Sequence, residues 1–456
     1  MPSLFPTAKA DTLLVGCAAG FSGDRTDAAT PVVRALAASG RPAALIFETL
    51  AERTLALAQL ARRADPATGY EPLLDAMVAP VLRDCLDHGI RIVSNFGAAN
   101  PRGAALRIRA IARALGLRAP RIAIVFGDDV SGPEHREALL QQAGDALAGR
   151  DIVSANAYLG AEPIAAAWRA GADVIVCGRV ADPSLTVGPA LAHHGWAADD
   201  WDRLARATMA GHLLECGAQV SGGYYADPGL KDVPGLATLG YPIAAIDRDG
   251  GCVIGKPDGT GGLIDQHTVK EQLLYEVHDP AAYLTPDVTA DIGAAEVTEL
   301  GADRVQLSGV RGHARPRELK VNVCFESGWL AEGEISYAGA RAEGRARLAA
   351  QVLRERLAGL GPLRADLIGV ASVFGDDAGR WLDAQAPGEA RDVRLRVALR
   401  HAERASAERL LREVTALYTC GPAGGGGVRT AIRPTLGTVS GLLSRDAVHS
   451  GFEMLD

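Results

Sequence analysis

A short glycine-rich segment, residues 211–225, places an acid, a thiol and several hydroxyl groups close together in the sequence. Glu215 is followed directly by Cys216, and Ser221 and two tyrosines come shortly after. A carboxyl group can act as a general acid or base, and a thiol can act as a nucleophile where a nearby base or cation stabilises the thiolate. We therefore treat Glu215 as a candidate acid/base residue and Cys216 as a candidate nucleophile, with a purely structural role as the alternative for both.

The other cysteines do not indicate a metal site or a disulfide framework. The chain has seven cysteines, an odd number, without a CxxC pair or a zinc-type spacing to a histidine. Cys177, Cys252 and Cys324 lie in apolar, strand-like runs and Cys85 lies on an expected helix, where cysteine behaves as a small apolar residue. Reduced thiols are therefore expected.

A second glycine-rich turn carries lysine, which is rare in this chain. Only five of the 47 basic residues are lysines, so a lysine that persists is a candidate for a role that arginine cannot fill. Lys256 opens the turn that contains Thr260, Gly261 and Gly262, and Lys270 follows at the start of an expected short helix. Together these groups suggest capture of a carboxylate or phosphate by side-chain cations and backbone N–H groups. The alternative is an ordinary turn with solvated lysines.

Polar positions also follow several strands that we expect in the N-terminal half. They are Ser22, Gly23, Asp24, Arg25, Glu48, Asn95, Asn100, Asn156, Arg179 and Asp182. The carboxyl ends of parallel strands meet at one edge of a sheet, where α/β proteins bind their ligands, so these residues are predicted to line a binding site. Asn and Asp are also common turn and helix-cap residues, which is the structural alternative for each of them singly.

The first of these loops does not have the spacing of a dinucleotide-binding loop. Gly16, Gly20 and Gly23 give a GxxxGxxG pattern, whereas the dinucleotide fingerprint is GxGxxG. NAD or a flavin is therefore not expected, although Glu48 stands about where a ribose-binding carboxylate would. A metal is not expected either, because the carboxylates of these loops can converge but no spacing among them demands an ion.

Short apolar runs alternate with longer helical stretches from about Asp11 to Val180 and indicate a mostly parallel sheet flanked by helices. The expected strands are residues 13–15, 43–47, 90–95, 121–126, 152–156 and 173–177, and the expected helices are residues 26–38, 52–63, 73–87, 103–115 and 163–170. Residues 212–268 contain many glycines and are expected to form loops and short strands over the sheet. This α/β part, residues 1–290, is predicted to be the ligand-binding and catalytic domain.

A strand-rich pattern begins near Asp303 and indicates a second domain, residues 291–456. Strands are expected at residues 304–310, 319–325 and 330–337, then a helix at 340–357, strands at 367–373 and 393–399, a helix at 405–417 and a closing strand at 437–442. From residue 330 the order is β-α-β-β-α-β, that of a ferredoxin-like sandwich. The predicted fold class is therefore an α/β domain, with a mostly parallel sheet, joined to a C-terminal α+β ferredoxin-like domain.

The composition of the chain restricts its partners. Of 456 residues, 48% are apolar, enough for a sizeable core, and no apolar run approaches the roughly 20 residues of a membrane span. A net charge of −8 argues against a nucleic-acid binder, and residues 1–10 lack the pattern of a signal peptide. We expect a cytoplasmic homo-oligomer whose partner is a small molecule rather than a membrane or a nucleic acid.

Several longer motifs of the chain resemble the acyclic terpene utilisation family AtuA, and the likeness covers nearly the whole sequence. The motifs are Gly20-Phe-Ser-Gly-Asp-Arg25, Leu50-Ala-Glu-Arg-Thr54, Gly97-Ala-Ala-Asn-Pro101, Ala155-Asn-Ala-Tyr-Leu-Gly160, Gly178-Arg-Val-Ala-Asp-Pro183, His212-Leu-Leu-Glu-Cys-Gly217, Gly259-Thr-Gly-Gly262 and residues 271–280. The resemblance implies a place in the degradation of citronellol and related branched isoprenoids, whose intermediates are acyl-CoA thioesters. It also implies a lyase or hydratase acting on a branched hydroxyacyl-CoA, with CoA as part of the substrate.

Three functions are compatible with these residues. The first is an enzyme for a branched carboxylate or its CoA thioester that performs C–C cleavage or water addition by general acid/base catalysis. Glu215 or Asp182 would be its base, and Arg179, Lys256 or Lys270 would be the cation that holds the oxyanion. The alternatives are a hydrolase that uses Cys216 and a non-catalytic ligand-binding or assembly subunit.

Overall fold

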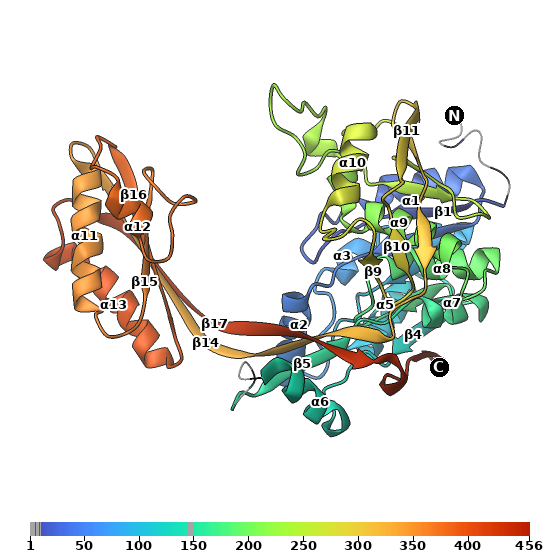
Figure 1. The fold of residues 1–456 in the computed structure, drawn as a ribbon, viewed down its shortest axis with the longest axis horizontal. Helices are drawn as coiled ribbons and strands as arrows, with labels where there is room; N and C mark the ends of the chain where they lie inside the picture. Colours follow the sequence, from blue (N-terminus) through green and yellow to red (C-terminus); the bar gives the residue numbers. More distant parts are fainter. Residues whose placement is uncertain (1–4, 6–8, 10, 145–146, 148) are drawn as a thin grey trace. The chain divides into compact units, whose positions relative to one another are not determined.

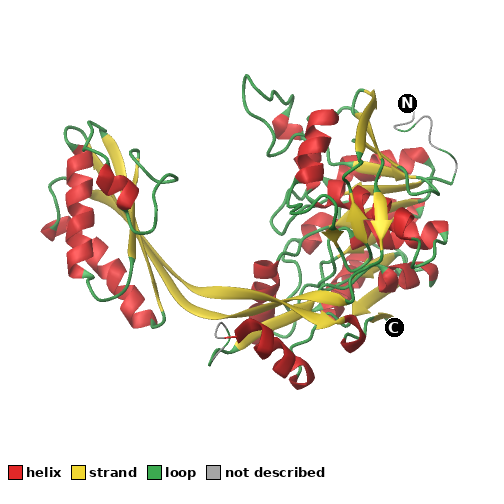
Figure 2. Ribbon diagram, viewed as in Figure 1, coloured by secondary structure: helices red, strands yellow, loops and turns green. Residues whose placement is uncertain are grey.

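The computed structural model describes Phe5, Lys9 and residues 11–144, 147 and 149–456. The chain divides into two compact units, residues 1–324 together with 438–456, and residues 325–437. Figures 1 and 2 show the helices and strands of each unit. Residues 291–324, which were expected in the second domain, belong to the first unit.

A large mixed sheet forms the core of the first unit. Its centre is parallel, with β1 (Leu13–Cys17), β2 (Ala43–Phe47), β3 (Arg91–Ser94), β6 (Val174–Val176) and β4 (Ile122–Phe126) side by side in this order. Antiparallel strands extend the sheet beyond β1 through β7 (Ile243–Ile246), β8 (Cys252–Gly255), β12 (Arg304–Ser308) and β11 (Glu296–Gly301), and beyond β4 through β18 (Gly451–Met454). The expected parallel centre is confirmed, and the sheet as a whole is mixed.

The central strands are apolar enough to be buried on both faces. β1 reads Leu-Leu-Val-Gly-Cys and β2 reads Ala-Ala-Leu-Ile-Phe, and every residue of both strands is buried. Strands of this kind need helices on both faces of the sheet. The helices that pack on the strands are α1 (Ala29–Ser39), α4 (Leu82–His88), α5 (Pro101–Ala114), α7 (Glu162–Arg169), α8 (Ser184–His194) and α9 (Trp201–Glu215). The carboxyl ends of the parallel strands consequently meet at one edge, as expected for the site.

Two helix expectations need correction. The helix expected at 73–87 is two helices, α3 (Leu74–Val78) and α4, because Pro80 between them has no N–H to donate. Residues 212–215 were expected in loops, but they form the last turn of α9, whose residues from Ala207 to Glu215 are all buried. The expected helix at 52–63 is α2 (Glu52–Ala64).

The strand β5 (Ile152–Ala157) is not part of the large sheet, contrary to expectation. It pairs with β14 (Glu318–Ala338), and Tyr158, directly after β5, donates its N–H to the carbonyl of Lys320 (2.9 Å). Ser154 and Asn156 alternate with apolar neighbours, a period of two that suits a strand with one polar face, whereas a central parallel strand is apolar on both faces. The pairing of β5 with β14 decides where Asn156 and Tyr158 lie.

The strand β14 is continuous, although two adjacent strands, 319–325 and 330–337, were expected in its place. Adjacent strands would have to pair with each other, but residues 329–338 pair with β16 (Asp392–His401) and β14 also pairs with β5. Gly328 has a positive φ of 85°, and a Cβ there would lie 2.5 Å from the carbonyl oxygen of His401, so glycine permits the close pairing. The chain enters the second unit along β14 and leaves it along β17 (Gly426–Ser444).

In the second unit the strand order is β15 (Leu363–Ile368), β16, β14, β17, and the β15–β16 and β16–β14 pairs are antiparallel. The helices α11 (Ala342–Arg356) and α13 (Arg404–Cys420) both pack on β16 and on each other, and Figure 1 shows them on the same side of this sheet. Their apolar sides join the strands in one buried cluster that includes Tyr337, Leu353 and Leu395. The described part of the unit also contains the short helix α12 (Arg380–Ala384).

A small sheet of β9 (Tyr283–Leu284), β10 (Thr289–Asp291) and β13 (Arg311–His313) packs against α9. It holds Tyr283 near the end of that helix. The helix α10 (Gln266–Leu274), which also packs on α9, begins with a capping box in which Asp265 accepts from the N–H of Thr268 and the Thr268 hydroxyl bonds back to Asp265. The end of α9 is therefore enclosed by elements from distant parts of the sequence.

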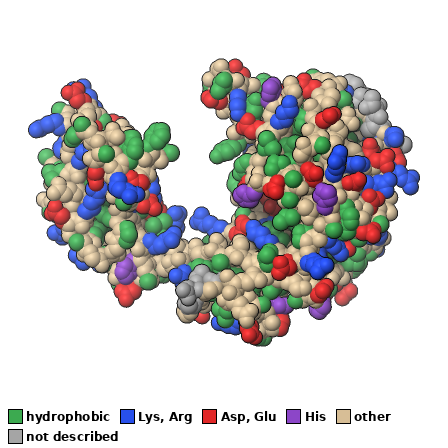
Figure 3. Space-filling model, viewed as in Figure 1, with side chains coloured by type: hydrophobic (Ala, Val, Ile, Leu, Met, Phe, Trp, Pro, Cys, Tyr) green, Lys and Arg blue, Asp and Glu red, His purple; other side chains and the backbone are tan. Residues whose placement is uncertain are grey.

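Among the described residues, no helix is long and apolar enough to cross a membrane. Acidic and basic side chains are interspersed on the face drawn in Figure 3. This mixture fits a net charge of only −8 on 456 residues.

Tyr337 provides a test of the second unit's core. Its side chain is fully buried in the cluster, and its hydroxyl has no hydrogen-bond partner among the described residues. Because a buried hydroxyl without a partner costs free energy, we expect Tyr337→Phe to leave the free energy of unfolding unchanged or to raise it. Leu353→Ala in the same cluster should lower it by about 2–5 kcal/mol through the cavity it leaves. Denaturant unfolding of both variants measures the difference, and equal losses in the two would contradict this account.

Candidate functional site

The last turn of α9 buries a histidine–glutamate pair. The Nδ1 atom of His212 lies 2.9 Å from Oε1 of Glu215, and the two side chains are only 1% and 9% exposed. The other ring nitrogen, Nε2, and the other carboxyl oxygen, Oε2, have no hydrogen-bond partner among the described residues. Buried polar atoms are ordinarily paired, so these two atoms indicate where a ligand or water binds.

The surroundings of this pair make it hold a proton. Burial disfavours the imidazolium, but the hydrogen bond and negative charge of Glu215, together with the backbone of Gln272 and the charge of Glu276, outweigh burial and raise the pKa of His212. Burial raises the pKa of Glu215 as well, and the hydrogen bond and charge of His212 offset this only in part. The pair therefore keeps a proton to higher pH than the separate side chains would, which suits proton transfer at neutral pH.

Tyr283 from the small sheet lies beside the pair, with 5.2 Å between its ring centroid and that of His212. Burial raises the pKa of the Tyr283 hydroxyl, and the negative charges of Glu215 and Asp182 raise it further. The phenol thus stays protonated at neutral pH. It adds a hydroxyl donor to this part of the molecule.

Glu48 is a second buried carboxyl group, directly after β2, with 6% of its surface exposed. Its Oε1 accepts hydrogen bonds from the N–H of Leu50 and from the side-chain amide of Asn95, both at 2.8 Å. Burial and the negative charge of Asp182 raise the pKa of Glu48 to about 8, against the opposing effect of Arg179. Glu48 is therefore largely protonated near neutral pH and can donate a proton, while Asn95 orients it.

Arg179, in the loop after β6, is a buried cation with 1% of its side chain exposed. Its Nε and Nη2 donate to the carbonyl of Val180 (2.9 and 2.6 Å), Nη1 donates to the carbonyl of Leu50, and Nη2 also donates to Asp182. Partial burial raises the pKa of Asp182, and the charge and hydrogen bond of Arg179 oppose this rise. Asp182 keeps 37% of its side chain exposed, so it is the open end of the ion pair.

Tyr158 fixes Arg179 from one side. Its ring contacts two cations, with 4.4 Å from the ring centroid to the guanidinium carbon of Arg179 and 4.6 Å to Nζ of Lys320. The Tyr158 hydroxyl donates to Glu52, and Nζ of Lys320 lies 3.1 Å from the same carboxylate. Burial would raise the pKa of Glu52, but the bonds from Tyr158 and Lys320 help to lower it to about 2. Glu52 is thus a stable counter-charge that holds the ring in place.

The first glycine-rich loop, after β1, packs directly on the end of α9. A Cβ at Gly20 would lie 2.4 Å from the carbonyl carbon of Cys216 and 2.4 Å from the nitrogen of Gly217, so glycine is needed for the contact. Asp24 holds the loop closed, because it accepts from the N–H of Gly20 (2.8 Å) and from the hydroxyl of Tyr241. The loop therefore borders the acid/base pair.

The other candidates in this loop contact protein groups. Ser22 hydrogen-bonds to the buried carboxyl of Glu71, and Gly23 has a positive φ of 100°. The guanidinium of Arg25 pairs with Asp27 (2.9 Å) rather than with the neighbouring carboxylate of Asp24. These contacts describe how the loop is held.

Cys216 lies beside the acid/base groups, but its surroundings do not favour a thiolate. Burial raises the pKa of its thiol, and the negative charges of Glu215 and Glu276 raise it further. A reactive cysteine needs a nearby cation or base to stabilise its thiolate, whereas the charges that act most strongly on Cys216 are those of carboxyl groups. The thiol form therefore prevails at neutral pH.

A second polar group lies at the ends of β4 and β5. Oδ2 of Asp128 accepts from the amide of Asn156 (2.9 Å) and from the N–H of Arg179 (2.8 Å), and burial raises the pKa of Asp128 to about 6. Asn100 caps α5 by accepting from a backbone N–H, and its amide donates to two backbone carbonyls. Asp128, Asn156 and Asn100 line a cavity of about 220 Å³ together with Ser154.

The two candidate lysines have different neighbours. Lys256 is buried, pairs with Asp303 (3.1 Å) and donates to the carbonyl of Thr260 (3.0 Å). The N–H groups of Gly261 and Gly262 donate to backbone carbonyls of the preceding loop (2.8 and 2.6 Å), so these donors are already paired within the chain.

Lys270 lies on the exposed side of α10, where its Nζ is 3.1 Å from the side-chain oxygen of Gln266. It lines a surface depression with Tyr225 and Lys231. The contacts described for Lys256 and Lys270 tie neither of them to Glu215.

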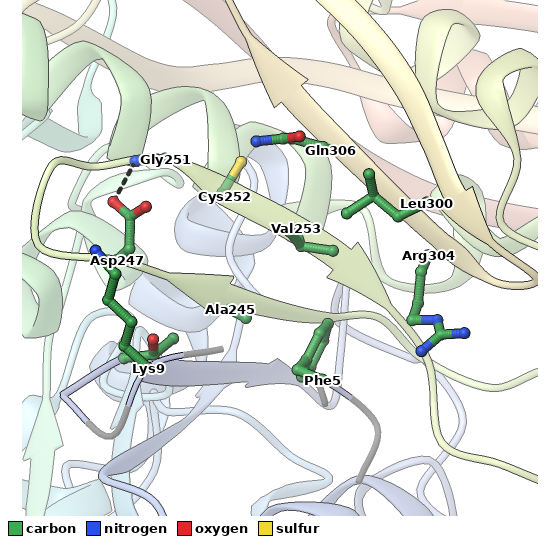
Figure 4. A pocket seen from close by; sticks show the side chains of 11 residues that line it. Phe5, Lys9, Ala245, Asp247, Gly251, Cys252, Val253, Leu300, Arg304 and Gln306 are labelled. Atoms are coloured by element: carbon green, nitrogen blue, oxygen red, sulfur yellow. Dashed lines mark hydrogen bonds between the residues drawn. The ribbon is translucent and has the colours of Figure 1, made fainter. Parts of the chain in front are cut away.

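Another cavity, of about 390 Å³, lies over the antiparallel strands β7, β8 and β12 (Figure 4). Its lining includes Phe5, Cys252, Leu300 and Arg304, and Asp247 accepts a hydrogen bond from the N–H of Gly251 there (2.9 Å). None of the residues expected at the site lines this cavity. It is therefore separate from the acid/base groups.

The structure brings Glu48, Asp182, Arg179, Glu215 and Cys216 together from three separate segments. Their proximity is seen in their electrostatic effects, because the charge of Asp182 raises the pKa of both Glu48 and Glu215. In the described part of the chain, no group of three or more His, Cys, Asp or Glu side chains is arranged to hold a metal ion. We name these five residues, with His212 and Tyr283, the carboxyl-edge cluster.

Sequence reasoning did not select His212, Tyr283 or Tyr158 as site residues. His212 precedes Glu215 by one helical turn, so its role follows once α9 is known to continue to Glu215. Tyr158 directly follows β5, so its place depends on the pairing of β5 with β14. Nothing in the sequence around Tyr283 indicated a site residue, because its position depends on how the small sheet packs on α9.

Comparison with known protein families gives a match over nearly the whole chain. The family model described as acyclic terpene utilisation family protein AtuA matches residues 13–454. This range includes every residue of the carboxyl-edge cluster and parts of both units. No curated protein and no solved structure matches the chain.

Glu48 makes stability depend on pH. Its pKa is about 8 in the folded chain against an ordinary value of 4.5, so the folded state binds the proton more tightly than the unfolded state does. The resulting stability is complete below the unfolded-state pKa and is lost as pH rises through the folded-state pKa. We expect the free energy of unfolding of the wild type to fall, relative to Glu48→Gln, by on the order of a few kcal/mol between about pH 5 and 8.

Glutamine is a suitable replacement because its amide oxygen can still accept from Leu50 and Asn95. Thermal unfolding of both proteins across this pH range measures the effect. Parallel pH profiles of the two proteins would show that Glu48 does not hold its proton.

Proposed function

The chain belongs to the acyclic terpene utilisation family AtuA, and from this premise we propose that it is a catabolic enzyme acting on a branched, isoprenoid-type carboxylate or its acyl-CoA thioester. The reaction we propose is a lyase or hydratase reaction with general acid/base chemistry. The observation that carries this proposal is the buried His212–Glu215 pair, whose Nε2 and Oε2 atoms have no partner among the described residues. A pair of this kind can take up and return a proton next to a bound substrate.

Both candidate reactions need a base and an acid near a carbonyl group. In hydration, a base takes a proton from water as its oxygen bonds to carbon, and an acid protonates the neighbouring carbon. In cleavage of a hydroxyacyl compound, a base takes the hydroxyl proton, the C–C bond breaks, and an acid protonates the resulting enolate. We assign the base to Glu215 with His212, and the acid to Glu48, which is supported by its raised pKa.

The other residues of the cluster have supporting roles in this proposal. Asp182, with its partly exposed side chain, is the second candidate base. Arg179 supplies the positive charge that keeps this carboxylate ionised, and Tyr283 is a neutral donor for a developing oxyanion. Lys256 and Lys270 were candidates to hold the oxyanion, but Lys256 pairs with Asp303 and Lys270 contacts Gln266. These contacts favour Tyr283 as the donor to the oxyanion.

The proposal also assigns roles to the two parts of the chain. All residues of the carboxyl-edge cluster lie between Glu48 and Tyr283, which supports placing ligand binding and catalysis in residues 1–290. A ferredoxin-like fold for the second unit is supported by its strand order β15-β16-β14-β17 and by the two helices that follow β14 and β16. Assembly of the chain as a homo-oligomer is part of the same proposal.

The test is turnover of a panel of substrates by the pure protein, with products identified by mass spectrometry. The panel contains branched and straight-chain acyl-CoA thioesters, with and without a 3-hydroxyl group, and the corresponding free acids. We expect turnover of a branched member. Tight binding of one member without turnover of any would favour the ligand-binding subunit instead.

Substitution of Glu215 distinguishes its catalytic role from a structural one. We expect Glu215→Gln to lower kcat/KM by about 100-fold to 10,000-fold, because the base is lost while the side-chain volume is kept. The melting temperature should change little. Unaltered kcat/KM in this variant would exclude Glu215 as the base.

Substitution of Cys216 distinguishes the acid/base mechanism from that of a Cys216-dependent hydrolase. Its thiol is surrounded by carboxyl groups that oppose ionisation, so we expect Cys216→Ala to keep kcat/KM within a few-fold of the wild type. The thiol-modifying reagent iodoacetamide gives a second measurement, with slow labelling of Cys216 expected at neutral pH. Complete loss of activity in Cys216→Ala, with normal melting, would support the hydrolase.

A further inference from the structure

A cavity of about 220 Å³ is lined by α2, by the loop that begins α5, by the end of β4 and by the polar side chains of β5. No residue of the carboxyl-edge cluster lines it. Pockets for drug-sized ligands have volumes of roughly 300–1,000 Å³, so a ligand of this cavity is smaller. The cavity is therefore a candidate for a second binding site, which the proposed function does not use.

The polar side chains of β5 have hydrogen-bonding capacity that the protein leaves unused. Ser154 and Asn156 are each only 5% exposed. The Ser154 hydroxyl has no nitrogen or oxygen partner among the described residues, where only the weakly polar thiol of Cys324 interacts with it. Asn156 donates its amide N–H to Asp128 (2.9 Å), and its carbonyl oxygen accepts from none of the described groups. Because buried polar groups are ordinarily paired, these atoms indicate a polar ligand.

Asp128 gives the β4 side of the cavity a negative charge. Its Oδ2 accepts from Asn156 and from the backbone N–H of Arg179 (2.8 Å), whereas no side chain among the described residues donates to Oδ1. Burial and the neighbouring charge of Asp129, which also lines the cavity, help to raise the pKa of Asp128 to about 6. The carboxyl group is therefore mostly ionised at pH 7.5, and an ammonium group suits this side of the cavity.

Arg62 gives the α2 side of the cavity a positive charge. Its Nη1 donates to the carbonyl of Ala99, and it forms no ion pair with an acidic side chain in the described part of the chain. The other arginine of the lining, Arg102, already pairs with Glu453 (3.2 Å). The remaining N–H groups of Arg62 can thus hold a carboxylate, which matches the planar guanidinium.

Apolar side chains complete the lining of the cavity. Ala98 and Ala99 come from the loop before α5, and Phe126 comes from the end of β4. They leave room for a small apolar group between the two charged sides. A ligand that matches the whole lining therefore has a cationic group, an anionic group and a small apolar part.

We propose that this cavity binds a small α-amino acid with an apolar side chain. The ammonium group donates to Asp128 Oδ1 and to the carbonyl oxygen of Asn156. The carboxylate accepts from Arg62 and from the Ser154 hydroxyl, and the side chain lies against the apolar part of the lining. This binding site does not depend on the reaction proposed for the carboxyl-edge cluster.

The experiment is isothermal titration calorimetry of the full chain at pH 7.5 with L-valine and two analogues that each lack one charged group. Isobutylamine lacks the carboxylate, and 2-hydroxy-3-methylbutyrate has a hydroxyl group in place of the ammonium group. We expect L-valine to bind more tightly than either analogue by about ten-fold or more, because each analogue loses one charge-assisted contact. L-alanine and L-leucine are titrated as well, to cover a smaller and a larger side chain.

Three variants locate the bound amino acid. Arg62→Gln and Asp128→Asn each remove one of the two charges, so each should weaken binding of L-valine by about ten-fold or more. In Arg62→Gln, L-valine should also lose its advantage over isobutylamine. Arg53→Gln makes the same change at an exposed position of α2 outside the cavity and should leave binding as in the wild type. Melting temperatures show which variants are folded, and two cavity variants keep the comparison if one of them does not fold.

The outcomes separate this inference from the proposed function, because the titrations measure no turnover. Failure of all three amino acids to bind, or an analogue that binds as tightly as L-valine, overturns the inference. Binding that is unchanged in the folded cavity variants also overturns it, because the amino acid then binds elsewhere. Weaker binding in a folded cavity variant, with unchanged binding in Arg53→Gln, supports the inference even where no substrate of the panel is turned over.

Discussion

The guanidinium of Arg179 is held with 1% of its side chain exposed, and a charge can be taken out of water in this way only where acceptors and counter-charges surround it. Backbone carbonyls after β2 and β6 supply the acceptors, Asp182 supplies the counter-charge, and the ring of Tyr158 covers one face. These groups come from three segments, the loops after β2 and β6 at the carboxyl edge of the sheet and the segment that follows β5. The buried cation therefore fixes the relative positions of these loops, and the remaining site residues depend on them.

A single buried cation does not balance the carboxyl groups that share this edge. Where negative charge exceeds positive charge in a place with little water, the carboxyl groups keep protons that they would release in solution. Glu48 and the His212–Glu215 pair both show this effect. The same excess of negative charge suppresses the thiolate of Cys216. One electrostatic condition thus favours acid/base chemistry and disfavours nucleophilic chemistry at neighbouring residues.

The sequence by itself determined the parallel centre of the sheet and the set of loops that could hold the site. Runs such as Ala43–Phe47 are apolar throughout, and such a run is stable only as a strand covered on both faces. The loops that follow parallel strands must then lie at one edge, which is why Glu48, Asp182 and Arg179 could be selected without a structure. The family was also recognisable from motifs alone, and the family model over residues 13–454 confirms it.

Tertiary structure decided the features that depend on pairing between distant segments. A strand pattern does not name its partner, so the sequence could not show that β5 pairs with β14 or that residues 319–325 and 330–337 form one strand. Residue type alone does not show which groups a side chain contacts. Lys256 was a candidate to bind an anion until its pairing with Asp303 was known. Tyr283 reaches His212 only because the small sheet packs on α9. The pKa of a carboxyl group is likewise set by burial and by charges remote in sequence. Sequence thus identified part of the groups that could perform chemistry, and packing added His212 and Tyr283 and decided which groups hold a proton.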